Sequence, residues 1–158
     1  MTTTIAPEPL AEPWARPVSA VSWSACAMAP SAACVPSMRH FVRSCVRRLR
    51  LAEEVCDTAC LVVSELVTNA VLHSGSHSVT VMVHFGGSEL VVAVRDDGHW
   101  LERTRPRANR ADHSATCGRG LDLVRAVSDD CAVDAGPDGT LISALVRIDG
   151  STTAEEAA

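Results

Sequence analysis

The sequence predicts an α+β fold: a two-layer sandwich with helices on one face of a mainly antiparallel sheet. Two long stretches in the first half repeat apolar residues at helical spacing. Two pairs of β-rich runs follow, and a short glycine-containing turn joins each pair. A third, short helical stretch separates the pairs. The predicted order is therefore (β)ααββ, a loop, and αββ.

The N-terminal half contains a strand and two helices in this interpretation. The run "AVSWSACAM" at 20–28 supplies the strand. Apolar residues recur every three or four positions from 36 to about 50, which predicts a first helix, and the arginines of that stretch form one of its faces. A second helix runs from about 52 to 73 and ends before a glycine.

The C-terminal half contains two hairpins and a helix. The runs "SVTVMVHF" at 78–85 and "ELVVAVRD" at 89–96 flank "GGS", so we expect an antiparallel pair. The polar stretch 97–120 is longer than a simple connection and is typical of a functional or mobile loop. "LDLVRAVSDD" then predicts a short helix. The last hairpin pairs "CAVDA" with "TLISALVRI" around "GPDG".

Length and composition limit the classes of protein to consider. With 158 residues we expect one domain, at 18–149, between disordered tails at 1–17 and 150–158. A net charge of -5 and an aromatic content of 3% argue against nucleic acid or an anionic membrane as a direct partner. The seven cysteines are odd in number and have no CxxC spacing, which favours buried thiols in a reducing cytoplasm. We found no typical signal peptide or membrane span and expect a cytoplasmic protein.

Three polar residues recur every four positions in "SELVTNAVLHSG": Glu65, Asn69 and His73. Such residues drift by only about 40° from one to the next around a helix, so they form one ridge. Asn69 and His73 fall at the edge of the apolar arc, and we expect them to be partly buried. Two interpretations are open at this point: a solvated polar face with a capped helix end, or a binding site that satisfies these groups.

Four short motifs occur in order along the chain, and each is weak alone: "ELVTNAVLH" (65–73), "VRDDGH" (94–99), "GRGLDLV" (118–124) and "GT" (139–140). Together they resemble the N, G1, G2 and G3 boxes of the GHKL (HATPase_c) ATP-binding superfamily of gyrase, histidine kinases and MutL. "VVSELVTNAVLH" and "GRGLDLV" look most like the stand-alone anti-sigma factor serine/threonine kinases of the RsbW and SpoIIAB type. The resemblance implies a Bergerat-type ATP-binding fold.

The resemblance gives the ridge a role. It implies that Asn69 binds Mg²⁺ through its amide oxygen while the metal bridges the phosphates of ATP. It also implies that Glu65 is the catalytic base, taking a proton from an attacking hydroxyl or positioning a water. His73 would contact a phosphate, although a simple helix-end residue explains it equally well.

The resemblance also implies an adenine pocket. Asp96 would accept a hydrogen bond from the adenine amino group, and Gly98 would let the base approach the backbone. Thr140 would reach the adenine through water, although threonine is also an ordinary strand residue. Asp97 is interpreted as local turn chemistry.

The phosphate end of the site follows the long loop. Gly118, Arg119 and Gly120 would open a helix whose free N–H groups and dipole suit a polyphosphate. The loop itself would be a lid over ATP. Its four arginines would stabilise the transferring phosphate or meet an acidic partner, unless they form a solvated basic loop: Arg103, Arg105, Arg107 and Arg110.

The function implied is that of a serine/threonine kinase acting on an anti-anti-sigma (STAS-domain) protein, which sequesters a sigma factor when not so engaged. The length leaves no room for the phosphoacceptor helices of histidine kinases or for a transducer domain. A homodimer is a further open expectation. The alternative is an ATP-binding regulatory module of the same fold that acts by association without kinase activity, since His99 and Trp100 stand where the G1 box often continues to another glycine.

Overall fold

The structure, a computed structural model, describes residues 21–99 and 118–148. The predicted tails, and residues 100–117 of the predicted loop, lie outside this described part. The described residues form three helices and five strands: β1 (Ser22–Met28), α1 (Cys34–Arg48), α2 (Glu53–His73), β2 (Val79–Phe85), β3 (Glu89–Asp96), α3 (Gly118–Val127), β4 (Asp130–Gly136) and β5 (Gly139–Arg147).

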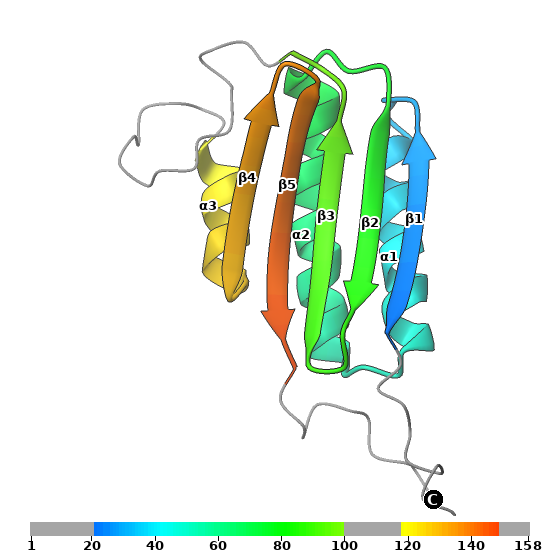
Figure 1. The fold of residues 1–158 in the computed structure, drawn as a ribbon. Helices are drawn as coiled ribbons and strands as arrows, with labels where there is room; N and C mark the ends of the chain where they lie inside the picture. The colour runs from blue at the N-terminus through cyan, green and yellow to red at the C-terminus, as the bar shows by residue number, and fades with distance from the viewer. Residues whose placement is uncertain (1–20, 100–117, 149–158) are drawn as a thin grey trace, which may run out of the picture.

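The five strands form one antiparallel sheet in the order β1-β2-β3-β5-β4. All three described helices lie on the same face of that sheet (Figure 1). Both predicted hairpins are present, and β1 adds to the free edge of β2. The predicted α+β sandwich is therefore confirmed. Predicted and observed boundaries of the two long helices differ by no more than two residues.

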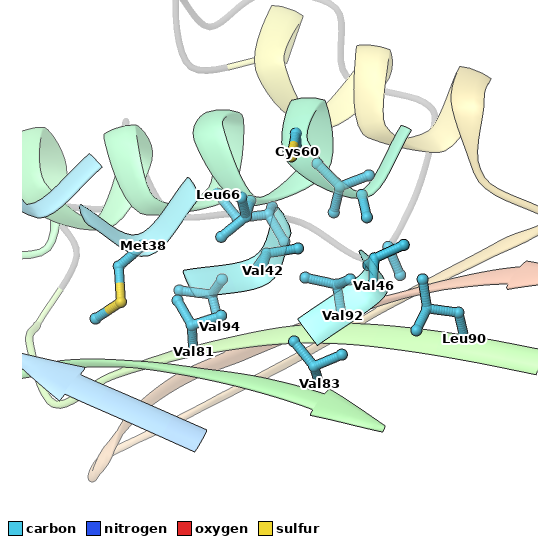
Figure 2. Close-up of a cluster of buried hydrophobic side chains, with 14 of the residues drawn as sticks. Met38, Val42, Val46, Cys60, Leu66, Val81, Val83, Leu90, Val92 and Val94 are labelled. Carbon is cyan, nitrogen blue, oxygen red and sulfur yellow. The ribbon is translucent and has the colours of Figure 1, made fainter. Parts of the chain in front are cut away.

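The core lies between the sheet and the first two helices (Figure 2). Alternate side chains along β2 and β3 point toward the helices, as the period-2 patterns of those strands predict. Their valines meet apolar residues that α1 and α2 present at helical spacing. Fully enclosed side chains on these four elements include Met38, Val42, Val46, Leu66, Val81 and Val92.

The central helix α2 packs against α1, α3 and strands β2, β3 and β5. An 18-residue window within this 21-residue helix has a mean hydropathy of 1.6, so by length and composition alone the helix could cross a membrane. Its apolar character has a different explanation here, because nine of its residues are buried against those neighbouring elements. Gly75, with φ of 64°, follows the helix end in the left-handed conformation expected there.

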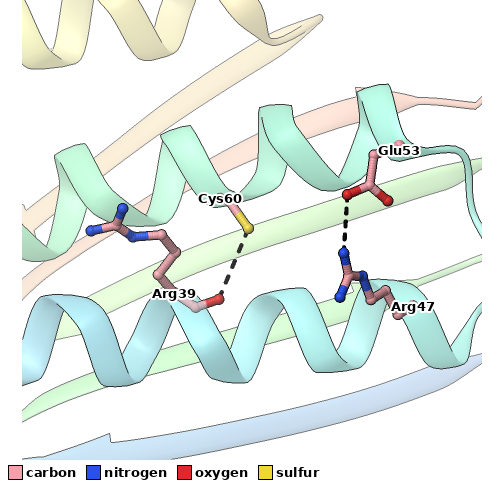
Figure 3. A network of polar contacts seen from close by, with 4 residues as sticks. All are labelled: Arg39, Arg47, Glu53 and Cys60. Atoms are coloured by element: carbon pink, nitrogen blue, oxygen red, sulfur yellow. Dashed lines mark hydrogen bonds and ion pairs between the residues drawn. The ribbon is translucent and has the colours of Figure 1, made fainter.

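The packing of α1 on α2 is supplemented by polar contacts (Figure 3). Nη2 of Arg47 lies 3.2 Å from Oε1 of Glu53, and the Cys60 thiol donates to the carbonyl oxygen of Arg39 at 3.9 Å. Burial raises the pKa of the Cys60 thiol. The expectation of buried thiols is confirmed for four of the described cysteines: Cys34, Cys45, Cys56 and Cys60.

Candidate functional site

Four polar residues are buried among the described residues, and all four lie at one end of the sheet. Ser74 and Ser76 follow the last turn of α2, Asp96 ends β3, and Thr140 begins β5. Their exposed fractions are 1%, 8%, 3% and 4% in that order. We call this end of the sandwich, where α2 and β3 both terminate, the polar end (top of Figure 1).

Asp96 occupies what would otherwise be a core position. Leu90, Val92 and Val94 alternate along β3 with their side chains toward the helices, and Asp96 is next in the same series. In the antiparallel register it stands opposite Thr140 on β5. Its Oδ1 accepts a hydrogen bond from the Gly98 amide at 3.0 Å. The fold therefore holds a carboxylate beside a threonine in a largely desolvated place.

Two glycines let the chain close around Asp96. A Cβ on Gly98 would overlap the Ser74 carbonyl oxygen and lie 2.7 Å from the Ser76 nitrogen. Gly139 has φ of 119°, and a Cβ there would overlap the Asp96 carbonyl oxygen. Gly98 thus has a packing role that we did not predict. Its predicted role in admitting a base to the backbone is separate and stays a prediction.

Asp97 links two loops of the polar end. Its Oδ1 accepts hydrogen bonds from the amides of His77 at 2.8 Å and Ser78 at 2.9 Å. The bond from Ser78, followed by that from His77, lowers the pKa of Asp97. The interpretation as purely local turn chemistry was too narrow. Nothing in the sequence indicated partners some twenty positions earlier.

The predicted ridge on α2 faces the beginning of α3. Glu65, Asn69 and His73 are each half-buried, as the helical wheel predicted for the last two. A Cβ on Gly120 would lie 2.8 Å from Oε2 of Glu65 and 3.2 Å from Nδ2 of Asn69. The glycine therefore lets the first turn of α3 approach the ridge closely. A helix N-terminus and a carboxylate are brought together here by packing.

For some predicted site residues, the side chains lie outside the described part of the structure. Gly118 and Arg119 open α3 together with Gly120, but the side chain of Arg119 lies outside the described part of the structure. The four lid arginines also lie outside it.

The donor groups beside α3 can be tested against the chemistry of Mg²⁺. Groups of three or more His, Cys, Asp or Glu side chains suited to hold a metal ion do not occur within 21–99 and 118–148. A magnesium ion bound with nucleotide does not need such a cage, because it retains waters and takes oxygens from the substrate phosphates. Asn69, beside the first turn of α3, has an amide oxygen of the hard kind that such an ion accepts. The described residues of the site fit an Mg²⁺ carried by the nucleotide better than a metal held by the protein alone.

The fold and the polar end together define a class of protein. Helices cover one face of an antiparallel sheet. The four predicted motif segments lie on α2, at the end of β3, at the start of α3 and at the start of β5. This is the arrangement of a GHKL-type ATPase domain. Comparison with known families makes this more specific. A family described as the histidine kinase-like ATPase domain matches residues 28–145, well over half of the chain. The protein belongs to this family.

A search of the curated proteins finds no match. Among solved structures, one similar chain is described as the RsbU and RsbW domains of Rv1364c from Mycobacterium tuberculosis. The match has a TM-score of 0.63 at 17% identity and covers 80% of the present chain. It covers 32% of the other chain, so the present chain spans about a third of that structure. At this identity the likeness shows the shared fold, and it agrees with the predicted RsbW-like resemblance.

Proposed function

We propose that the protein binds ATP with Mg²⁺ at the polar end and transfers the γ-phosphoryl group to a serine or threonine of an anti-anti-sigma (STAS-domain) protein. The observation that carries this proposal is the approach of Gly120 to Glu65, where a Cβ would lie 2.8 Å from Oε2. It brings a candidate base to the N-terminal turn of a helix, where N–H groups and the helix dipole favour phosphate.

The adenine end of the proposed site lies at Asp96. Its carboxylate accepts hydrogen bonds only, which suits the exocyclic amino group of adenine. Thr140 stands opposite on β5 and is 4% exposed, and its hydroxyl would share a water with the base. Burial strengthens these hydrogen bonds to the base, because competing bulk water is excluded.

The phosphate end lies between α2 and α3. Gly118, Arg119 and Gly120 would hold the phosphates with the free amides of the first turn, and His73 would add a contact near the end of α2. Asn69 would hold the Mg²⁺, which supplies positive charge to the phosphate oxygens when bound.

Glu65 would act on the hydroxyl of the protein substrate. The serine or threonine oxygen forms a bond to the γ-phosphorus, the bond to the β,γ-bridging oxygen breaks, and ADP leaves. Glu65 receives the hydroxyl proton and returns it to solvent after release. This role needs a half-buried carboxylate that still reaches the nucleotide, and Glu65 is half-buried beside α3.

The partners are proposed from the RsbW-like likeness. A sigma factor would be held when the STAS protein is absent or phosphorylated, and the protein would act in the cytoplasm without direct contact to nucleic acid or membrane. Homodimerisation stays a prediction. The similar structure contains RsbU and RsbW domains of one protein. This supports a regulatory system in which such a domain works with protein partners.

The test is phosphotransfer from γ-labelled ATP to a panel of STAS proteins, with Mg²⁺ and with the ion chelated. Glu65→Gln is expected to retain ATP binding and to slow transfer by about a hundredfold or more, the usual contribution of a general base. Glu54→Gln is the matched control, because Glu54 is exposed on the same helix. Unchanged transfer in Glu65→Gln would remove Glu65 from this role. ATP binding by the parent without transfer to any STAS protein would favour the module that acts by association alone.

A further inference from the structure

The loop after α2 and the loop after β3 form one tightly joined corner of the polar end. Asp97 accepts hydrogen bonds from the amides of His77 and Ser78, at 2.8 and 2.9 Å. Gly98 packs so closely that a Cβ would lie 2.7 Å from the nitrogen of Ser76. The backbone of Ser76 is therefore held beside the residues that follow Asp96.

Ser76 has a hydroxyl with nothing to bond to in this corner. The residue is 8% exposed, and within 21–99 and 118–148 its Oγ has no hydrogen-bond partner. Among the described residues, Ser76 Oγ is the one buried side-chain oxygen or nitrogen without a hydrogen-bond partner. Such a group has lost its bonds to bulk water without replacement, and it destabilises the fold unless a bound water or ligand satisfies it.

Ser74, two residues earlier, shows the contrast. Its hydroxyl donates to the Ala70 carbonyl oxygen at 2.6 Å and accepts from the Ser76 amide at 3.2 Å. Ser74 therefore serves the end of α2, and its hydroxyl is fully used within the protein. The hydroxyl of Ser76 has no comparable structural use in the described residues.

We propose that Ser76 is a further adenine-binding residue of the nucleotide site, whose hydroxyl donates a hydrogen bond to N1 of adenine, directly or through one water. The inference rests on the proposed ATP binding. Asp96 accepts a bond from the amino group, and the neighbouring ring nitrogen N1 needs a donor, which a carboxylate cannot provide. Ser76 provides that donor from the corner that also holds Gly98, the amide partner of Asp96.

Guanine limits what this residue can do. At the corresponding edge it presents a carbonyl oxygen and a protonated N1. A serine hydroxyl can accept from that N1 as readily as it donates to the N1 of adenine, so the preference for adenine rests on the acceptor-only carboxylate of Asp96, and Ser76 adds affinity.

The experiment is calorimetric titration of the parent, Ser76→Ala and Ser78→Ala with ATP and with 1-deaza-ATP, which keeps the amino group and lacks the N1 acceptor. Ser78 is the matched control, because it bonds Asp97 through its amide, which alanine keeps. We expect Ser76→Ala to bind ATP roughly 3- to 10-fold more weakly, the range of one neutral hydrogen bond. Its affinity for 1-deaza-ATP should equal that of the parent. Ser78→Ala should match the parent with both ligands.

Melting curves without nucleotide accompany the titration. We expect Ser76→Ala to melt at the same temperature as the parent or higher, because the substitution removes an unsatisfied buried hydroxyl. Parent-like ATP affinity in Ser76→Ala would overturn the role of Ser76 while leaving ATP binding intact. If Ser76→Ala lost affinity equally for ATP and 1-deaza-ATP, or melted at a clearly lower temperature than the parent, the N1 assignment would be overturned in favour of a structural role. Failure of the parent to bind ATP would instead overturn the proposed function, and this inference with it.

Discussion

The two ends of the sandwich are built from the same elements and differ in what they bury. At the end where β2 turns into β3, the inward residues are apolar, with Phe85 opposite Leu90 and Leu90 opposite Val146. At the polar end, Asp96 and Thr140 occupy the equivalent inward positions of β3 and β5. We call the first the apolar end. Stability and the proposed chemistry are therefore separated along the length of one sheet.

The difference shows how a fold accommodates a costly site. A carboxylate at an inward position of a sheet loses hydration, and this cost is offset only by hydrogen bonds such as that from the Gly98 amide. The apolar end and the centre bury large aliphatic side chains, which stabilise the whole sheet. Because the strands are continuous, side chains at one end can stabilise an expensive arrangement at the other.

The largest expected effect tests the apolar end. Leu90 is 0% exposed, and Leu90→Ala should cost about 2 to 5 kcal/mol of unfolding free energy through lost burial and a cavity. The ATP affinity of the folded variant should stay that of the parent. Urea unfolding and calorimetric titration measure these two quantities.

Val91→Ala is the control for that variant, because Val91 faces the other side of the sheet and is half-buried. Its cost should be smaller. A large loss of ATP affinity in folded Leu90→Ala would show that the two ends are not separable.

The next effect tests the polar end. Asp96→Ala should lower ATP affinity by about 10- to 150-fold, the value of a charge-assisted hydrogen bond of roughly 1.5 to 3 kcal/mol. GTP should bind the parent much more weakly than ATP, because its carbonyl would face the Asp96 carboxylate, and the substitution should narrow this preference. Calorimetric titration with both nucleotides measures the change.

Melting curves distinguish this from a structural effect. If Asp96 only shaped the turn, its loss would lower stability by about 1 kcal/mol and leave nucleotide discrimination unchanged. A parent that binds ATP and GTP equally would contradict the adenine assignment.

The smallest effect concerns Asp97, which joins the two loops of the polar end. Its pKa is lowered by the amide bonds, so its contribution to stability is full above the unfolded value near 3.8. That contribution is lost as the pH falls below this value through the lower pKa of the folded protein. Asp97→Asn should therefore show a smaller drop in melting temperature between about pH 5 and about pH 3 than the parent.

Asp134→Asn is the control, because Asp134 is exposed on β4. It should retain the acid-induced drop of the parent. An identical drop in Asp97→Asn would show that the two amide bonds add no pH-dependent stability.

Most of the fold could be predicted because its signals are local. The helical spacing of apolar residues gave α1 and α2, and alternation flanking "GGS" gave the β2-β3 hairpin. The ridge could be predicted for the same reason, since Glu65, Asn69 and His73 share one helix. The hydroxyl of Ser76 and the long-range partners of Asp97 could not, because neither residue has a local pattern that indicates burial or a distant contact.

The sequence by itself determined the elements, their order and the four motifs, because periodicity and turn chemistry act over a few residues. Only the tertiary structure decided how the motifs meet. The packing of α3 on α2 places Gly120 against Glu65, the pairing of β3 with β5 places Asp96 opposite Thr140, and the closure of two loops encloses Ser76. Each of these contacts joins residues far apart in the chain. Their physical cause is the burial of one shared core, which fixes the positions of all the elements at once.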